Sequence, residues 1–459
     1  MRSELFGAWS KRRTRKLHST MILLSHPTGS TPARHAALGL HRAGLLGEFW
    51  IGEAPSAPSW ITRLLPGRGQ QTSQYRAYPE ELNDKIRMRS LQAATQGIVQ
   101  RLGLARQRSR EEESDHEAAA FRMLDRSVAK RLSSGDFAGV YAYEDGAESA
   151  FRTARELHEL CIYDKPTLHW KAVRELLREE AELEPQWAGT LAEQPASDEA
   201  CARRDSEISL ADVIIVPSVF AKHTVEQQIH TRARIAVVPF GPPAHPPAIT
   251  ERKRDASPKL RVLFVGPLTQ TRGLSYLFAA VRQLDGAAEL TVAGHRPILP
   301  CSALDEELSR INFITPASQQ EVLHLMAQHD VLVYPSLFED FGPELLDAMA
   351  SGLPVIATPN SAAPDLISDG CEGFIVPIRS AQAIAEKLHL LIREPERLAE
   401  MSNRATLRAR EFNWKRYETT LATRVSETLA IAGRGTCSSY ARATPAPHLP
   451  GIVPLDQNR

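Results

Sequence analysis

The sequence predicts an α/β protein with two doubly wound, parallel-sheet domains that face each other across a cleft. Three observations support this prediction. The chain has 459 residues, apolar β-branched runs alternate with amphipathic helical stretches along it, and a proline-rich, then charged stretch divides it near the middle. At about 100–200 residues per domain, this length favours two or three domains. Continuous apolar strands that are each followed by a helix are typical of parallel sheets covered on both faces.

The composition is that of a globular protein and disfavours some partners. Apolar residues make up 42% of the chain and charged residues 24%, as in ordinary globular domains. The 55 basic residues balance 55 acidic ones, so we predict no nucleic-acid partner. The five cysteines show no metal-ligand spacing, which predicts no metal site and a cytoplasmic location. No apolar run approaches the ~18 residues of a membrane span, so we expect no transmembrane segment.

The two ends of the chain differ from the rest in composition. Residues 1–20 are basic but lack the apolar stretch of a signal peptide, so we predict a disordered extension. A peripheral membrane contact through this basic segment is the less favoured alternative. Met21 opens the first strand-like run, and translation that begins there is a further alternative. Residues 434–459 are rich in proline, serine and alanine without periodicity, and we predict a disordered tail.

Within these ends the expected elements follow one another in two halves. The first domain is expected over 21–241, with strands in the runs MILLSH, EFWIG, GVYAY, LCIYD, DVIIVPS and IAVVPF. Residues 242–260 are the predicted linker. The second domain is expected over 261–412, with strands in RVLFVG, AELTVAG, INFI, DVLVYPS, PVIAT and GFIVP. A C-terminal helix is expected over 413–433.

Ligands of open α/β sheets bind beyond the carboxyl ends of the strands, where helix N-termini point their amides. In the second domain, Gly266 follows a strand, and Arg272 lies at the start of the next helix. A cation there opposes the helix dipole by a few tenths of a kcal/mol, so Arg272 favours a bound anion. A solvated surface arginine is the alternative.

The run FEDFGPELLDAMASGLPVIATP, from residue 338 to 359, gathers further candidates around a second helix start. Glu339 is expected to close a strand. The Phe341–Gly342 turn offers amides that can hold a phosphate, and Pro343 suits a first helical position. Asp347 is expected one turn inside the helix, away from its apolar stripe, where a carboxylate can accept hydrogen bonds from a diol such as a ribose. Stabilisation of the helix dipole is the alternative role of Asp347.

At this point the chain resembles a known family, the retaining, family-four glycosyltransferases of GT-B architecture. EDFGPELLDAMASGLPVIAT is similar to the family signature, two glutamates separated by seven residues around a Phe-Gly turn. Further similar runs between roughly residues 210 and 420 are ADVIIVPSVFAKHTV, IAVVPFG, FVGPLTQTRG, DVLVYPS, ISDGCEGFIVP and FNWKRYETTL. The resemblance implies that Glu339 contacts the donor sugar and Arg272 the donor phosphates. It also implies a ribose contact for Asp347 and a pyrophosphate contact for the Gly342 region.

The chain departs from the family pattern at two positions. Asp347 stands where the family usually has glutamate, and Pro267 stands where many members carry a second phosphate-binding arginine. Asp347 is one methylene shorter than glutamate but is still a diol acceptor. With Pro267, neutralisation of the donor phosphates is expected to depend mainly on Arg272 and on backbone amides.

The resemblance places the acceptor in the first domain. Its first turn, SHPTGST, replaces the family's Gly-Gly loop, and His26, Gly29 and Ser30 are candidate cleft residues. A capped turn between strand and helix is the equally favoured alternative for them. The run VYAYEDGAESAF follows the strand after which many members place a histidine near the reacting centre. It offers Tyr143, Glu144 and Asp145 as candidates. A capping box formed by Asp145 with Glu148 is the favoured structural role of that acidic pair.

We therefore predict a retaining glycosyltransferase that moves a sugar from a nucleotide diphosphate-sugar donor to an unidentified acceptor. The acceptor is a glycan, a lipid-linked molecule or a small molecule, and no metal or other cofactor is expected beyond the nucleotide-sugar as co-substrate. A GT-B phosphorylase or epimerase is an alternative that would favour a richer phosphate pocket or a second acidic dyad. A catalytically silent GT-B protein that serves as a binding or assembly partner is the other alternative, favoured by Asp347 and Pro267.

Overall fold

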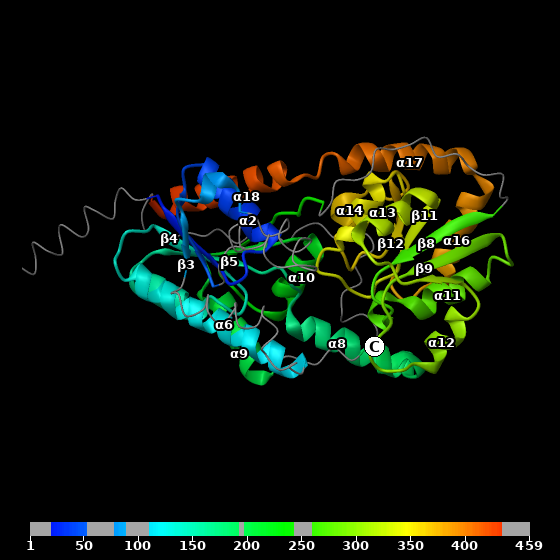
Figure 1. Cartoon of the computed structure of the whole chain (residues 1–459), viewed down its shortest axis with the longest axis horizontal. Coiled ribbons are helices and arrows are strands. Elements are labelled where there is room, and N and C mark those ends of the chain that lie inside the picture. Colours follow the sequence, from blue (N-terminus) through cyan, green and yellow to red (C-terminus); the bar gives the residue numbers. More distant parts are fainter. Residues whose placement is uncertain (1–19, 53–77, 89–109, 192–196, 243–258, 434–459) are drawn as a thin grey trace, which may run out of the picture.

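The computed structural model describes residues 20–52, 78–88, 110–191, 197–242 and 259–433. It contains two parallel sheets that lie side by side, each covered by helices (Figure 1). The predicted fold class, α/β with two Rossmann-like domains, is confirmed. The predicted N-terminal extension, linker and C-terminal tail lie almost entirely outside the described residues.

The first sheet has seven parallel strands in the order β3-β2-β1-β4-β5-β6-β7. Sequence order changes direction between β1 and β4, which are neighbours at the centre. In such sheets the carboxyl ends of the strands at this switch point are the preferred place for a ligand. The strands are β1 (Ile22–His26), β2 (Leu46–Ile51), β3 (Ile86–Met88), β4 (Gly139–Tyr143), β5 (Leu160–Asp164), β6 (Val213–Val216) and β7 (Arg234–Val237).

The second sheet has six parallel strands in the order β10-β9-β8-β11-β12-β13. Its switch point lies between β8 and β11, so the loops that follow these two strands emerge next to each other. The strands are β8 (Leu260–Val265), β9 (Ala288–Ala293), β10 (Asn312–Ile314), β11 (Val331–Tyr334), β12 (Val355–Ala357) and β13 (Gly373–Ile375).

Helices connect successive strands and cover both faces of each sheet (Figure 1). Those of the first half are α2 (Thr31–Arg42), η1 (Glu80–Leu82), α6 (Arg110–Leu132), α7 (Glu148–Glu156), α8 (Trp170–Leu183), η2 (Pro185–Thr190), α9 (Asp198–Leu210) and α10 (Val219–Gln228). Those of the second half are η3 (Gln270–Arg272), α11 (Leu274–Arg282), α12 (Ser302–Leu308), α13 (Gln319–Gln328), α14 (Pro343–Ala350), α15 (Ala363–Leu366), α16 (Ala381–Arg393), α17 (Pro395–Ala409) and α18 (Trp414–Gly433).

The central strands are buried along their whole length because helices cover both of their faces. All five residues of β4 and of β5 are buried, and so are the four of β11. Burial of a large aliphatic side chain contributes roughly 1.5–3 kcal/mol. These strands therefore anchor the two cores, and their carboxyl ends are held firmly in place.

The last helix, α18, returns from the second half to pack on α2 of the first (Figure 1). The helices approach closely at Gly39, where an added Cβ would lie 2.6 Å from the carbonyl oxygen of Glu418. His35 stacks on Trp414 with 4.2 Å between ring centroids, and its Nδ1 lies 2.7 Å from the Glu418 carboxylate. Tyr417, Leu421 and Val425 of α18 belong to the core cluster that surrounds β1 and β4.

The strands expected from the sequence are all present, but one strand was missed. β3 has three residues and pairs with β2 at the edge of the first sheet. An edge strand of this length buries little, so its sequence carries no apolar run. Among the described residues, no helix is both long enough and apolar enough to cross a bilayer.

Candidate functional site

Arg272 and Glu339 lie in the loops that follow β8 and β11, the two strands at which the strand order of the second sheet changes direction. Arg272 ends η3, which follows β8, and Glu339 lies in the loop after β11. Their side chains form an ion pair, with Arg272 Nη1 2.7 Å from Glu339 Oε1. The side chains are only 13% and 17% exposed, so water screens the pair weakly. Glu339 lies five residues beyond the end of β11, so the expectation that it closes that strand was wrong.

Tyr334, the last residue of β11, organises the surroundings of this pair. Its hydroxyl accepts a hydrogen bond from Arg272 Nη1 and donates one of 3.2 Å to Glu344. Burial and the nearby carboxylates of Glu344 and Glu339 hold the pKa of Tyr334 well above its ordinary value. Burial acts to lower the pKa of Arg272, but the attraction of Tyr334 and Glu339 outweighs it, so that pKa is raised. Arg272 therefore remains a cation here.

Two of the predicted glycines border the same group. Gly342 precedes α14 with φ of +80°, and an added Cβ would lie 3.0 Å from the Tyr334 hydroxyl. Pro343 occupies the first helical position, as expected. Gly266 follows β8 with φ of +146°, and a Cβ there would lie 3.9 Å from the Arg272 guanidinium. Both turns need left-handed backbone, which glycine adopts without steric cost.

Asp347 lies inside α14 but is far more enclosed than a surface diol acceptor would be. Its side chain is buried, with an exposed fraction of 2% for the residue. Its Oδ2 accepts a 2.7 Å hydrogen bond from Gln319 Nε2 of α13. Burial, helped by Glu344, raises the pKa of Asp347 to about 7. A ribose at this position would have to share the carboxyl group with Gln319.

The predicted first-domain candidates form a second group at the switch point between β1 and β4. The backbone amide of Gly29 donates to His26 Nδ1 at 3.0 Å, while Ser30 Oγ lies 3.2 Å from His26 Nε2. Ser30 also caps α2 by accepting from Ala33 N. The His26 ring meets the Tyr143 ring edge to face at 4.5 Å. Burial lowers the pKa of His26 to about 4, so the imidazole is neutral at pH 7. The turn between β1 and α2 is thus the capped turn that the sequence offered as one alternative.

The capping box expected from Asp145 and Glu148 is absent. Asp145 has φ of +69° and pairs with Arg203 and Arg204 instead. The N-cap of α7 is Ala147, whose amide donates to the buried carboxylate of Glu207 at 3.0 Å. Asp125 of α6 accepts from two amides of the first helical turn, those of Ser149 and Ala150. Carboxylates from neighbouring helices, which local sequence does not reveal, satisfy this helix start.

Glu144 is a buried structural residue in the described arrangement. Lys165 Nζ donates to Glu144 Oε1 at 2.6 Å, and Thr167 donates to the other oxygen. Lys165 itself is 1% exposed. A buried charge is tolerated only when it is paired and hydrogen-bonded in this way.

The residue beside Glu339 joins the two halves of the molecule. Asp340 Oδ1 accepts from the backbone amide of Leu168 at 2.8 Å, and its carbonyl accepts from Ser218 Oγ at 2.9 Å. Asp365 adds a parallel contact, accepting from the amide of Val219 at 3.0 Å. The loops after β5 and β6 of the first sheet are therefore bonded to the loop that carries Glu339.

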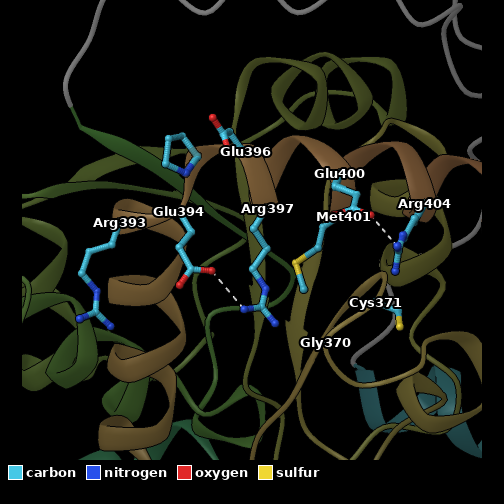
Figure 2. Close-up of a pocket in the computed structure, with 10 residues that line it drawn as sticks. Gly370, Cys371, Arg393, Glu394, Glu396, Arg397, Glu400, Met401 and Arg404 are labelled. Carbon is cyan, nitrogen blue, oxygen red and sulfur yellow. Dashed lines mark hydrogen bonds and ion pairs between the residues drawn. The ribbon is translucent and has the colours of Figure 1, made fainter.

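A cavity of about 740 Å³ lies elsewhere in the second domain, along α17 (Figure 2). Its charged side chains are largely paired along α17, as Arg397 with Glu394 at 3.1 Å and Arg404 with Glu400. None of the sequence-predicted site residues lines it, so we do not assign the site to this cavity. It is lined by Gly370, Cys371, Arg393, Glu394, Pro395, Glu396, Arg397, Glu400, Met401 and Arg404.

Within the described ranges, no group of three or more His, Cys, Asp or Glu side chains is placed to hold a metal ion. The site that the structure assembles is Arg272, Glu339, Tyr334 and Gly342, with Gly266 alongside. Sequence reasoning missed Tyr334. Its position at the end of the run DVLVY could have indicated it, because the last residue of a strand at the switch point lies at the edge of the sheet where ligands bind.

Sequence comparisons show that this chain is similar to glycosyltransferases. Residues 248–408 match the family model "Glycosyl transferases group 1". The D-inositol 3-phosphate glycosyltransferase of Corynebacterium glutamicum (strain R) is 30% identical over 243 residues, 47% of this chain and 58% of the relative. The amylovoran biosynthesis glycosyltransferase AmsK of Erwinia amylovora is 31% identical over 139 residues, 28% of this chain and 34% of that protein. The chain thus covers less than two thirds of these relatives.

Solved structures match over most of the chain. Sucrose-phosphate synthase from Thermosynechococcus elongatus has a TM-score of 0.60 at 16% identity, covering 89% of this chain and 99% of its own. Anabaena HepE in complex with UDP has a TM-score of 0.54 at 15% identity, covering 90% of this chain and 100% of its own. At these identities the likeness concerns the fold alone.

Proposed function

We propose that this chain, which has the GT-B fold and carries a group 1 glycosyltransferase domain, is a retaining glycosyltransferase that uses a nucleotide diphosphate-sugar. One observation carries the proposal: Arg272 and Glu339 form an ion pair at the switch point of the second sheet, beside the N-terminus of α14. A guanidinium and helix amides at one point suit a diphosphate. A carboxylate beside them suits the hydroxyl groups of a sugar.

The chemistry follows from the charge that develops on the leaving group. When the bond from the sugar to the diphosphate breaks, negative charge grows on the phosphate oxygens. Arg272 and the amides after Gly342 are fixed donors that stabilise that charge without reorganising. The diphosphate competes with Glu339 for Arg272, and Glu339 then turns to the sugar. Metal independence is part of the proposal because Arg272 supplies the positive charge, and turnover in excess EDTA tests it.

The donor and acceptor classes are narrower proposals. HepE has been crystallised with UDP and with UDP-glucose, which favours uridine nucleotides as the first donors to test. The names of these relatives favour D-inositol 3-phosphate and intermediates of amylovoran biosynthesis as the first acceptors. Lipid-linked acceptors belong in the same screen. We propose that the protein acts in the cytoplasm, and the four cysteines that form no disulfide among the described residues support this.

A thermal-shift screen across nucleotide-sugars tests the donor proposal. A ligand present at 100 times its dissociation constant adds about 2.7 kcal/mol to the unfolding free energy. Each donor that stabilises the protein is then assayed for sugar transfer and for hydrolysis. Retention is tested by the anomeric configuration of the product. If no nucleotide or nucleotide-sugar shifts the melting temperature, the proposal is wrong.

A catalytically silent binding protein is the second candidate, and Asp347 is the observation that favours it. Its carboxyl group is buried against Gln319 rather than presented to a ligand. This candidate predicts nucleotide binding without turnover for any acceptor, both in wild type and when Glu339 is replaced by glutamine.

A further inference from the structure

Helix α8 and the short helix η2 belong to the first half of the sequence but pack on the second sheet's helices. In Figure 1, α8 runs along one edge of the molecule towards α11 and α12. Trp187 of η2 is a member of the second domain's core and stacks on Phe278 with 6.0 Å between ring centroids. Residues 170–190 are therefore an arm that the first domain extends into the second.

Glu180, in the last half of α8, is the centre of this contact. It is fully buried, and three donors from the second domain meet its carboxylate. Gln270 Nε2 and the Tyr276 hydroxyl donate to Oε1 at 2.7 and 3.0 Å, and Arg379 Nε donates to Oε2 at 2.8 Å. A buried carboxylate with donors on both oxygens is held in one orientation.

Gln270 connects Glu180 to the start of α11 by hydrogen bonds to both. The N-cap of α11 is Gly273, which has no side chain to satisfy the first amides. Gln270 Oε1 accepts from Ser275 N at 3.1 Å, and its Nε2 donates to Ser275 Oγ at 2.6 Å. Thr190 of the arm accepts from Gln270 N at 2.9 Å. The side chain of Gln270 thus performs the capping that Gly273 lacks, and Arg272 lies between these two anchored residues.

The residues just before the arm contact the loop that carries Glu339. Leu168, two residues before α8, donates its amide to Asp340, the neighbour of Glu339. One helix therefore holds the loop of Arg272 at one end and the loop of Glu339 at the other. The ion pair between Arg272 and Glu339 completes this ring of contacts.

The Arg379 contact shows that the arm also constrains the second domain's backbone. Arg379 has φ of +62°, which is unfavourable for any residue with a Cβ. Such a conformation persists only where surrounding contacts determine it. Arg379 bonds both Glu180 and its neighbour Glu179, the latter at 3.1 Å.

We propose that Glu180 is a positioning residue for the diphosphate site: through Gln270 it fixes the first turn of α11 and thereby the guanidinium of Arg272. This rests on the proposed function, because it takes Arg272 as the phosphate contact. Glu180 itself lies in the arm and touches no substrate in this scheme. Its replacement should weaken nucleotide binding without adding to the effect of removing Arg272.

The test is calorimetric titration of the full chain with UDP, GDP and ADP. Glu180→Ala should weaken binding about tenfold, since a misplaced charged donor loses a contact of that order. Glu180→Gln keeps an acceptor for Gln270 and the shape of the side chain. It should therefore weaken nucleotide binding less than Glu180→Ala does. Glu179→Gln is the matched control, because Glu179 contacts the same Arg379 but is 31% exposed. The affinity of Glu179→Gln for these nucleotides should stay within about twofold of that of wild type.

A double-mutant cycle distinguishes positioning from a general loss of structure. In an Arg272→Ala background, Glu180→Ala should change affinity by less than about twofold, because its effect passes through Arg272. If the losses of binding free energy caused by Arg272→Ala and Glu180→Ala add in full in the double variant, the proposal is overturned. A Glu180→Ala protein that binds as tightly as Glu179→Gln overturns it as well.

Amide hydrogen exchange gives a readout that needs no ligand. Glu180→Ala, or Glu180→Gln if the alanine variant does not fold, should speed exchange at Ser275, whose amide is bonded to Gln270. Exchange in α14 should not change. If wild type binds none of the three nucleotides, the proposed function is wrong, while the exchange result still decides the role of Glu180. Equal exchange in wild type and both Glu180 variants would overturn that role.

Discussion

The Arg272 guanidinium lies 2.7 Å from the Glu339 carboxylate, so each group is neutralised by a residue that we propose to act on the same donor molecule. Binding of a diphosphate-sugar must therefore exchange one internal ion pair for two contacts with the ligand. The net gain in affinity is smaller than the sum of those contacts, because the pair is already satisfied.

Replacement of Arg272 by alanine should weaken nucleoside-diphosphate binding while the fold is kept. A charged hydrogen bond contributes roughly 1.5–3 kcal/mol, which corresponds to a loss of affinity of about ten- to a hundredfold. Arg282→Ala is the matched control, because Arg282 lies in the following helix, is 54% exposed and pairs with Glu307. Calorimetry with equal affinities for wild type and Arg272→Ala would contradict the assignment.

Glu339→Gln should separate binding from turnover. Nucleoside diphosphates should bind at least as tightly as to wild type, since Arg272 loses an internal competitor. Turnover should fall by a factor of at least about ten, or ~1.4 kcal/mol of transition-state stabilisation. Initial rates with the donor found by thermal shift measure this. Unchanged turnover in an active enzyme would remove Glu339 from the proposed chemistry.

Gly342→Ala should destabilise the protein by more than its backbone conformation alone explains. Left-handed backbone costs a non-glycine residue about 1–2 kcal/mol, and a Cβ here would also press against the Tyr334 hydroxyl at 3.0 Å. Gly286→Ala is the control, because Gly286 has φ of +83° with no atom within 4 Å of an added Cβ. Urea unfolding should show the larger loss for Gly342→Ala, and equal losses would mean that the Tyr334 contact is unimportant.

The buried carboxyl group of Asp347 predicts a pH dependence of stability. Its pKa is raised from 3.8 to about 7 in the folded protein. Between these values the native state binds more protons than the unfolded state, so this group makes stability fall as pH rises from about 4 to 7. Asp347→Asn keeps an acceptor for Gln319 but does not titrate. The free energy of unfolding of Asp347→Asn minus that of wild type should therefore increase over this pH range.

Measuring that difference, rather than wild type alone, isolates Asp347 from other buried acids. Burial also raises the pKa values of Asp164 and Glu207 to about 7, and both residues are present in wild type and variant alike. A difference that stays constant between pH 4 and pH 7 would show that the carboxyl group of Asp347 titrates normally in the folded protein.

The sequence was sufficient where a feature depends on neighbours in the chain. The parallel strands, the glycine before α14 and the proline at its first position follow from local pattern, and the structure has them. Strand β3 could not be predicted, because it exists only through pairing with β2. The start of α7 was misjudged for the same reason, since Asp125 and Glu207 reach it from other helices.

The candidate site also has parts that local sequence predicts and parts that it does not. The loops of Arg272 and Glu339 could be located because each follows an apolar strand. Their 2.7 Å contact depends on the order of β8 and β11 in the sheet. The enclosure of Asp347 by Gln319 and the reach of Glu180 to Gln270 are long-range contacts. Short sequence patterns carry no information about such partners.

The return of α18 to the first domain has a consequence for the order of events during synthesis. Tyr417, Leu421 and Val425 complete the core around β1 and β4, yet a ribosome makes them after every strand of both sheets. Domains generally fold as units while the chain emerges. The second domain can close its core first, whereas the nascent first domain keeps an apolar face exposed until residue 425 has left the exit tunnel. Chaperone dependence should therefore be greatest for the half that is made first.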